Sequence, residues 1–154
     1  MRCRVIAAGT RLPAWVDAGF QEYQKRLRQP VTLELREIPL GARSAGAARA
    51  KQREGEAMLA ALGRDDHVVA LDVAGRSLSS EQLAAWLRQR LGEGRHLAFL
   101  IGGPDGLSGD CQSRAELAWS LSPLTFPHGL VRIMLAEQIY RATTLIAGHP
   151  YHRA

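Results

Sequence analysis

The sequence contains no apolar run approaching the roughly 20 residues that a membrane-spanning helix needs. Its first residues, Met1 to Ile6, enter a strand-like pattern without the apolar core and small-residue cleavage site of a signal peptide. Only two cysteines occur, Cys3 and Cys111, and they lie far apart in the sequence. That spacing excludes a disulfide framework and a zinc knuckle, and it suits two ordinary reduced thiols. We therefore expect a cytoplasmic protein with no membrane segment.

Several catalytic motifs are also missing. The sequence has no G-x-x-x-x-G-K-[ST], no G-x-G-x-x-G after a strand, no H-E-x-x-H, no C-x-x-C and no G-x-S-x-G. P-loop, Rossmann, zincin and serine-hydrolase chemistry are therefore not indicated. His149 and His152 are three residues apart, but they lie in a proline-containing tail with no third ligand in view, so we expect no metal site.

The composition is that of a globular chain with a basic first third. The 154 residues are 46% hydrophobic and 23% charged, which suits a single domain over residues 1–154. The net charge is +5, and residues 1–53 carry 11 basic against 4 acidic side chains. Two interpretations stay open: this end binds a polyanion such as RNA or DNA, or it is an arginine-rich solvated surface.

The central stretch runs from Leu97 to Leu107. Leu97 to Ile101 is a short apolar run typical of a buried strand, and three glycines and a proline follow within the next five residues. Such residues end a strand in a tight turn with bare backbone. In open α/β sheets the carboxyl ends of strands form the usual binding edge, so this turn is a candidate binding site.

Strand and helix patterns alternate along the whole chain, which predicts a three-layer α/β/α domain with a mostly parallel sheet. Thr10 is a candidate cap for the first helix, Ser79 and Gln82 form a predicted capping box, and Ala74 to Arg76 is predicted to turn. We expect strands over 3–8, 31–38, 67–73, 97–101 and 118–121, a first helix that follows Thr10, has Pro13 in its first turn and runs to about Leu27, and further helices from about 47 to 62, 80 to 91, 108 to 117 and 129 to 147.

Three turns follow three of the expected strands, after Leu71, after Ile101 and after Leu121. If those strands are neighbours, the turns meet at one edge and enclose a pocket of backbone and apolar side chains. Such a pocket suits a flat, neutral heteroaromatic ligand, whereas a triphosphate would lack a lysine partner. Three unrelated turns are the alternative at this point.

Several blocks of this sequence resemble the ribosomal large-subunit pseudouridine N3-methyltransferase family, of the SPOUT or α/β-knot class. The resemblance covers essentially the whole chain, with the blocks in the same order and the same tail. The blocks are Val69 to Asp72, Leu100 to Leu107, Ser120 to His128, Val131-Arg132, Glu137 to Ala142 and His149 to Arg153.

The resemblance implies a fold, a cofactor and a partner. It implies a C-terminal trefoil knot, which is rare among proteins and which no periodicity predicts. It also implies S-adenosylmethionine as methyl donor, no metal, and a homodimer with the last helix in the interface. The residues that it implies for the cofactor pocket are Leu71, Gly103, Ser122, Pro123, Leu124, Thr125, Phe126 and Pro127.

The implied reaction is methylation of N3 of a pseudouridine in 23S rRNA, on assembled ribosomes. Removing the N3 proton, with a pKa of ~9, costs ~3 kcal/mol at pH 7. A base or a cation that favours the anion offsets this cost. His152 is our candidate base, Arg141 a candidate cation or an ion-pair partner of Glu137, and Tyr151 a candidate stacking residue for a flipped base.

Five basic residues are candidates for rRNA contacts. Three of them, Arg49, Lys51 and Arg53, lie near a helix start, where they oppose the helix dipole, so phosphate contacts explain them better than local stability does. The candidates are Arg43, Arg49, Lys51, Arg53 and Arg153.

Three other functions compete with this one. The first is methylation of another rRNA or tRNA nucleotide by an enzyme of the same class. The second is a ribosome-binding factor that keeps the fold without catalysis. The third is a metal hydrolase that uses His128, His149 and His152.

Overall fold

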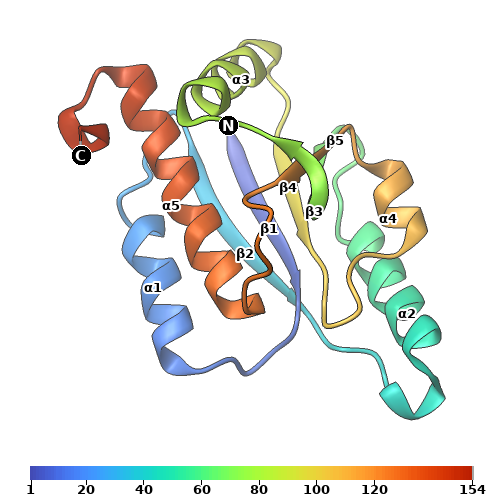
Figure 1. The fold of residues 1–154 in the computed structure, drawn as a ribbon. Helices are drawn as coiled ribbons and strands as arrows, with labels where there is room; N and C mark the ends of the chain where they lie inside the picture. Colours follow the sequence, from blue (N-terminus) through green and yellow to red (C-terminus); the bar gives the residue numbers. More distant parts are fainter. Residues whose placement is uncertain (154) are drawn as a thin grey trace.

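The fold is built on one five-stranded sheet in which every neighbouring pair of strands is parallel (Figure 1). The structure, a computed structural model, describes residues 1–153 except for the side chain of His152. The strands are β1 (Arg2–Ala8), β2 (Thr32–Ile38), β3 (His67–Ser77), β4 (Leu97–Ile101) and β5 (Leu117–Ser120). The helices are α1 (Ala14–Gln24), α2 (Ala47–Ala60), α3 (Ser80–Glu93), α4 (Gly109–Arg114) and α5 (His128–Ala147), with short 3-10 turns η1 (Arg43–Ala45) and η2 (Pro150–His152).

Helices cover both faces of the sheet, which confirms the predicted three layers. Helices α1, α3 and α5 pack on one face, and α2 and α4 pack on the other (Figure 1). The strand order is β2-β1-β4-β3-β5. The predicted "mostly parallel" sheet is therefore parallel throughout.

The core follows from the alternation of side chains along buried strands. In β1, Val5 and Ala7 belong to the core under α1, α3 and α5, whereas Ile6 and Ala8 belong to the core under α2 and α4. Strand β4 is buried over its whole length, as a central parallel strand with two covered faces must be. Its apolar sequence is what this position requires.

The three strands that the sequence singled out lie side by side. Strand β3 pairs with β4 on one side and with β5 on the other. The carboxyl ends of β4 and β5 therefore lie at one edge, as expected for the turns after Ile101 and Leu121, whereas β3 continues past Leu71.

Strand β3 is longer than predicted, and the expected turn at Ala74 to Arg76 is wrong. After an irregularity between Leu71 and Arg76, β3 pairs with β5 again through Trp119. A Cβ on Gly75 would lie 2.7 Å from the carbonyl oxygen of Ala118. Gly75 therefore permits a close approach of two backbones inside a strand instead of reversing the chain.

The helix ends differ from the expectations by one turn or less. Helix α1 ends at Gln24 rather than near Leu27, because the chain tightens into three-residue turns such as Leu27 N–H to Gln24 O at 3.2 Å. Thr10 does not cap α1, since Pro13 precedes it without a side-chain cap. The capping box of Ser79 and Gln82 at α3 is confirmed. In the described part of the chain, no helix has the length and apolar character that a membrane span requires.

The packing of α2 on α4 depends on a glycine. A Cβ on Gly55 would lie 2.8 Å from the Cβ of Ser108 and closer still to its hydroxyl. We expect Gly55→Ala to lower the free energy of unfolding by about 1–3 kcal/mol through overpacking. Gly92→Ala in α3 is the matched control, because nothing lies within 4 Å of its added Cβ and alanine favours the helix. Urea denaturation that ranks Gly55→Ala as no less stable than Gly92→Ala would contradict this packing.

Candidate active site at the carboxyl edge of the sheet

A cavity of about 520 Å³ lies where β4 and β5 end, beside the irregularity of β3 that follows Leu71. This volume falls within the ~300–1,000 Å³ typical of small-molecule sites. Strand ends form part of its wall, and the glycine turn, the loop after β5, α2, α4 and the first turn of α5 supply the rest. The residues that line the cavity include Lys51, Leu71, Asp72, Gly103, Gln112, Trp119, Phe126 and His128.

The glycine turn closes on itself through backbone contacts. The amide of Gly106 donates to the carbonyl of Gly103 at 3.0 Å, and Gly106 has a φ of 82°, in the left-handed region that favours glycine. A Cβ on Gly102 would lie 2.7 Å from the Gly106 carbonyl oxygen. No side chain fits at Gly102 without moving backbone, so the cavity wall here consists of main chain.

A buried carboxylate fixes the turn from outside the cavity. Glu54 is 3% exposed, and its Oε2 accepts from the Gly41 amide at 2.9 Å and from Arg43 Nη1 at 2.7 Å. Arg43 also pairs with Asp105 of the turn at 3.2 Å. A Cβ on Gly103 would lie 2.9 Å from Glu54 Oε1. Arg43, predicted to contact rRNA, is thus engaged within the protein.

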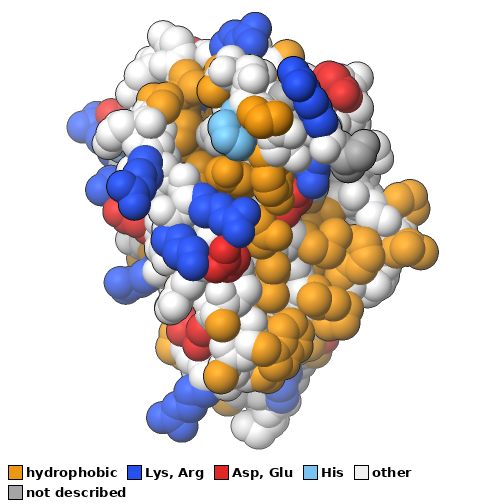
Figure 2. Space-filling model, turned by 90° about the vertical axis from the view of Figure 1, so that its left-hand side faces the viewer, with side chains coloured by type: hydrophobic (Ala, Val, Ile, Leu, Met, Phe, Trp, Pro, Cys, Tyr) orange, Lys and Arg blue, Asp and Glu red, His pale blue; other side chains and the backbone are white. Residues whose placement is uncertain are grey.

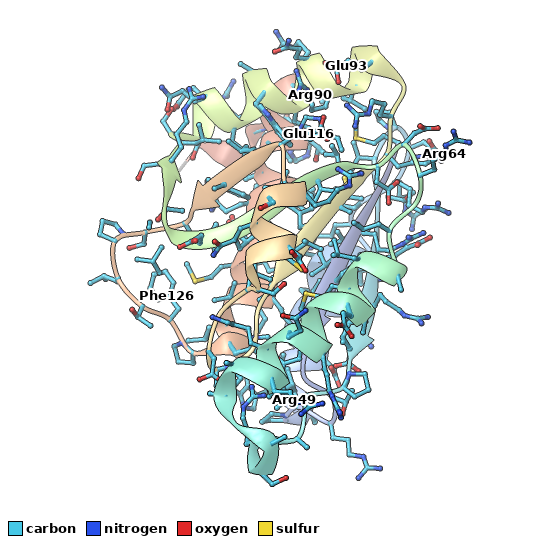
Figure 3. All side chains as sticks on the ribbon, turned by 90° about the vertical axis from the view of Figure 1, so that its right-hand side faces the viewer. Arg49, Arg64, Arg90, Glu93, Glu116 and Phe126 are labelled. Carbon is cyan, nitrogen blue, oxygen red and sulfur yellow. The ribbon has the colours of Figure 1, made fainter. Side chains whose placement is uncertain are left out.

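The loop after β5 forms the opposite wall. Ser120 Oγ donates to the carbonyl of Ser122 at 2.9 Å, and the amide of Leu124 donates to Ser122 Oγ at 3.0 Å. These bonds shape the loop that carries Phe126 (Figure 3). Six predicted cofactor residues line the cavity and two, Pro123 and Pro127, do not; those that do are Leu71, Gly103, Ser122, Leu124, Thr125 and Phe126.

Arg132 holds the start of α5 against the ends of β1 and β2. It is fully buried and donates to Glu37 Oε2 at 2.6 Å and to the carbonyl of Gly9 at 2.8 Å. Its Nη2 also lies 3.2 Å from Nε2 of His128, one helical turn earlier. Because a guanidinium only donates, this contact needs a neutral imidazole. Burial lowers the pKa of His128, and the charge of Arg132 lowers it further, which keeps the ring neutral.

The predicted catalytic residues gather at the other end of α5. Arg141 donates to Glu137 Oε1 at 2.6 Å, and the Tyr151 hydroxyl donates to the same oxygen at 3.1 Å. The Glu137 contact raises the pKa of Arg141, and burial raises the pKa of Tyr151 to about 12. The sequence left two roles open for Arg141, and the ion pair with Glu137 is confirmed. The side chain of His152 lies outside the described residues.

This cluster does not reach the cavity of the same chain. Arg141 follows His128 by 13 positions on α5, which corresponds to about 20 Å at 1.5 Å per residue. In a single chain the predicted catalytic residues Arg141 and Tyr151 and the candidate cofactor pocket are therefore separate.

The predicted rRNA residues fall into three environments. Arg49 and Arg53 are exposed on the first half of α2, and Arg153 is exposed in the tail (Figure 3 labels Arg49). Lys51 is half-buried and lines the cavity, and Arg43 is paired as described.

Sequence reasoning missed several residues that shape the site. Arg132 is the clearest, and Glu54 and Asp72 belong with it; His128 was considered only as a metal ligand and not as a partner of Arg132. A charged residue inside an apolar helix was the available signal for Arg132, since such a charge must find a buried partner. Over the described residues, no group of three or more His, Cys, Asp or Glu side chains is placed to hold a metal ion.

A parallel sheet with a cavity of small-molecule size at the carboxyl ends of its strands defines an α/β domain with a candidate ligand site at the usual edge of the sheet. A family model described as "Predicted SPOUT methyltransferase" matches residues 1–152. The chain belongs to the SPOUT methyltransferase family.

Named relatives match over their full length. The ribosomal RNA large subunit methyltransferase H of Xanthomonas campestris pv. campestris (strain B100) is 57% identical, with 100% of both chains covered. The proteins of the same name from Alkalilimnicola ehrlichii and from Xanthomonas oryzae pv. oryzae (strain PXO99A) are 57% and 55% identical, again with 100% of both chains covered.

The neutral state of His128 makes stability depend on pH. Its folded pKa is lowered, so the unfolded chain binds more protons below its ordinary pKa of about 6.5, and stability is lost as the pH falls through that range. His67, whose pKa burial also lowers, acts in the same direction. We expect the free energy of unfolding to fall between pH 7.5 and 5.5, and His128→Gln to flatten this dependence.

The pH dependence is measured by urea unfolding at several pH values, with the parent protein and His128→Gln compared under the same conditions. An unchanged slope in His128→Gln would show that His128 is not held neutral in the folded state.

Proposed function

We propose that this chain transfers a methyl group from S-adenosylmethionine to N3 of a pseudouridine in 23S rRNA, on assembled ribosomes. Its membership of the SPOUT methyltransferases and its full-length similarity to large-subunit rRNA methyltransferases support the reaction class. The observation that carries the proposal is the cavity at the ends of β4 and β5, beside the irregularity of β3, walled by the turn and loop that the resemblance assigns to the cofactor.

The cavity fits the cofactor by its chemistry. Trp119, Phe126 and Leu71 supply apolar wall for a flat ring, and the backbone of the Gly102 to Gly106 turn supplies amides and carbonyls. A side chain at Gly103 would collide with Glu54, so this part of the wall consists of main chain. When bound, S-adenosylmethionine supplies an electrophilic methyl group on a sulfonium, so neither a metal nor a covalent enzyme intermediate is required.

The chain's own residues then have to hold the acceptor and ease the loss of its N3 proton. Arg141, permanently cationic, favours the imide anion that forms. Tyr151, with its pKa raised to about 12, stays protonated at neutral pH and acts as a donor or stacking surface rather than as a base. His152 remains the proposed base.

A homodimer brings the two halves of this site together. The cluster of Glu137, Arg141 and Tyr151 lies about 20 Å along α5 from the cavity of its own chain. Hydrophobic side chains gather over α1 and α5 on the face in Figure 2, and Trp15 and Leu130 on these helices are 55% and 38% exposed. We infer that a second copy packs on this face and places its α5 end at the first copy's cavity.

The trefoil knot belongs to the same proposal. It is supported by the chain path: β5 lies at the edge of the sheet beyond β3, while α5 packs between α1 and α3 on one face. The connection over residues 121–127 has to cross the carboxyl ends of the strands, beside the glycine turn, to join them.

The reaction is tested by methyl transfer from labelled S-adenosylmethionine to ribosomal RNA from cells that lack this gene. Assembled ribosomes, isolated large subunits and naked rRNA are compared. We expect label in one large-subunit nucleotide, strongest with assembled ribosomes, because a small enzyme depends on the shape of its target.

Other outcomes of this assay identify the competing functions. Binding of S-adenosylmethionine without label in any of the three substrates would point to another RNA target. Binding to ribosomes without binding of S-adenosylmethionine would instead indicate a non-catalytic ribosome-binding factor.

We also propose that Arg49, Arg53 and Arg153 contact rRNA phosphates. Arg49→Glu with Arg53→Glu should weaken ribosome binding and lower the slope of log affinity against log salt by about one per lost phosphate contact. The matched control is Arg88→Glu on α3, at the end of the molecule opposite the first turn of α2 (Figure 3). An unchanged salt slope in the double variant, measured by a binding titration, would remove these residues from the interface.

A further inference from the structure

The cavity carries one permanent positive charge among the described residues that line it, that of Lys51. Two carboxylates, Asp72 and Asp105, share the lining, and His128 is held neutral. Asp105 is already matched by Arg43 at 3.2 Å. Asp72 accepts from the Ala74 amide at 2.9 Å and from Gln112 at 3.4 Å. Asp72 has neutral partners only, so a ligand in this cavity meets one cation, Lys51, and one carboxylate, Asp72, that no opposite charge matches. Lys51 is the one of the two that can bind an anionic group.

Nothing local explains a lysine at this position. Lys51 is the fifth residue of α2, near the positive end of the helix dipole, where a cation is unfavourable. The residues four positions away are Ala47 and Gly55, and Glu54, three positions away, is engaged by Arg43. Within residues 1–153, no carboxylate lies within 4.0 Å of the Lys51 ammonium.

Lys51 also points away from the other basic residues of α2. Arg49 and Arg53 are four positions apart, so they lie on one face of the helix. Lys51 is two positions from each, about 200° around the helix axis, which places it on the opposite face. Accordingly, Arg49 and Arg53 are exposed, whereas Lys51 is half-buried at the cavity. A shared phosphate-binding patch is therefore a poor explanation for Lys51.

The cavity has an apolar side and a polar side. Trp119 of β5, Phe126 of the loop and Val131 of α5 form the apolar side. The polar side belongs to α2 and α4, which stand together in Figure 3, with Lys51 on α2 and Gln112 on α4. The two helices pack closely at Gly55, one turn beyond Lys51, which fixes the position of this part of α2.

We propose that the Lys51 ammonium binds the α-carboxylate of S-adenosylmethionine; this inference rests on the function proposed above. The carboxylate is the only anionic group of that molecule. Its adenine ring matches the apolar side of the cavity, which leaves the amino-acid end for the side with the unmatched cation. A charge-assisted bond in a half-enclosed cavity is stronger than one on an open surface.

The test compares two ligands that differ in the amino-acid group. S-adenosylhomocysteine carries the carboxylate, and 5′-methylthioadenosine lacks the entire amino-acid end. By calorimetry, Lys51→Met should weaken S-adenosylhomocysteine binding by about tenfold, the size expected for a hydrogen bond between charged groups. It should leave 5′-methylthioadenosine binding unchanged, and Lys51→Arg should restore most of the loss. The control is Lys25→Met, because Lys25 is exposed and paired with Glu22.

Amine labelling gives a readout that does not need a variant. Lys25 and Lys51 are the only lysines of the chain, so their modification is easily separated by mass spectrometry. S-adenosylhomocysteine should protect Lys51 several-fold from acetylation and leave Lys25 unprotected. Naked rRNA should not protect Lys51.

Each contrary outcome has its own meaning. Equal loss of both ligands in Lys51→Met would make Lys51 a structural residue. Unchanged S-adenosylhomocysteine binding together with weaker ribosome binding would make it an rRNA contact, and either result overturns the inference. If the unchanged chain binds neither ligand, the proposed cofactor is wrong, and this inference falls with it.

Discussion

The buried guanidinium of Arg132 is the interaction on which the arrangement of the site depends. It is fully buried and joins three parts of the chain: the carbonyl of Gly9 after β1, the Glu37 carboxylate on β2, and the His128 ring at the start of α5. A buried charge without partners would cost several kcal/mol, so these contacts fix one geometry rather than several. The first turn of α5, which walls the cavity, is therefore positioned by strands far away in sequence.

Close backbone approach is the second constraint, and glycines make it possible. Gly75 lies against the backbone of Ala118 and Gly102 against that of Gly106, where any side chain would collide with main chain. The same residue type that looks like a turn signal in a sequence is used here in two different ways. At Gly102 it does belong to a turn, and at Gly75 it lets two strands lie close together.

These two constraints explain what the sequence predicted and what it did not. Apolar runs such as Leu97 to Ile101, capping residues and glycine clusters are local signals, and they predicted the layers, the parallel sheet and the edge where the cavity lies. Within the candidate site, Gly103 and most of the loop after β5 were found through the family resemblance. Arg132 and Glu54 were missed, because they have partners that lie 11 to 124 positions away, where no periodicity links them.

The basic residues near α2 also show what a sequence pattern cannot predict. Arg43, Arg49, Lys51 and Arg53 look alike as a charge cluster, and charge alone predicts one common partner. The fold places them in different environments. Arg43 forms ion pairs with Glu54 and Asp105. Arg49 and Arg53 are exposed to solvent, and Lys51 lines the cavity. Helical periodicity explains part of this separation, since positions 49 and 53 share a face and position 51 does not. The pairing of Arg43 requires the buried Glu54 and the glycine turn, which only the folded chain brings together. Net charge therefore describes how strongly this end of the molecule attracts a polyanion, whereas the role of each cation depends on which carboxylates the fold brings within reach.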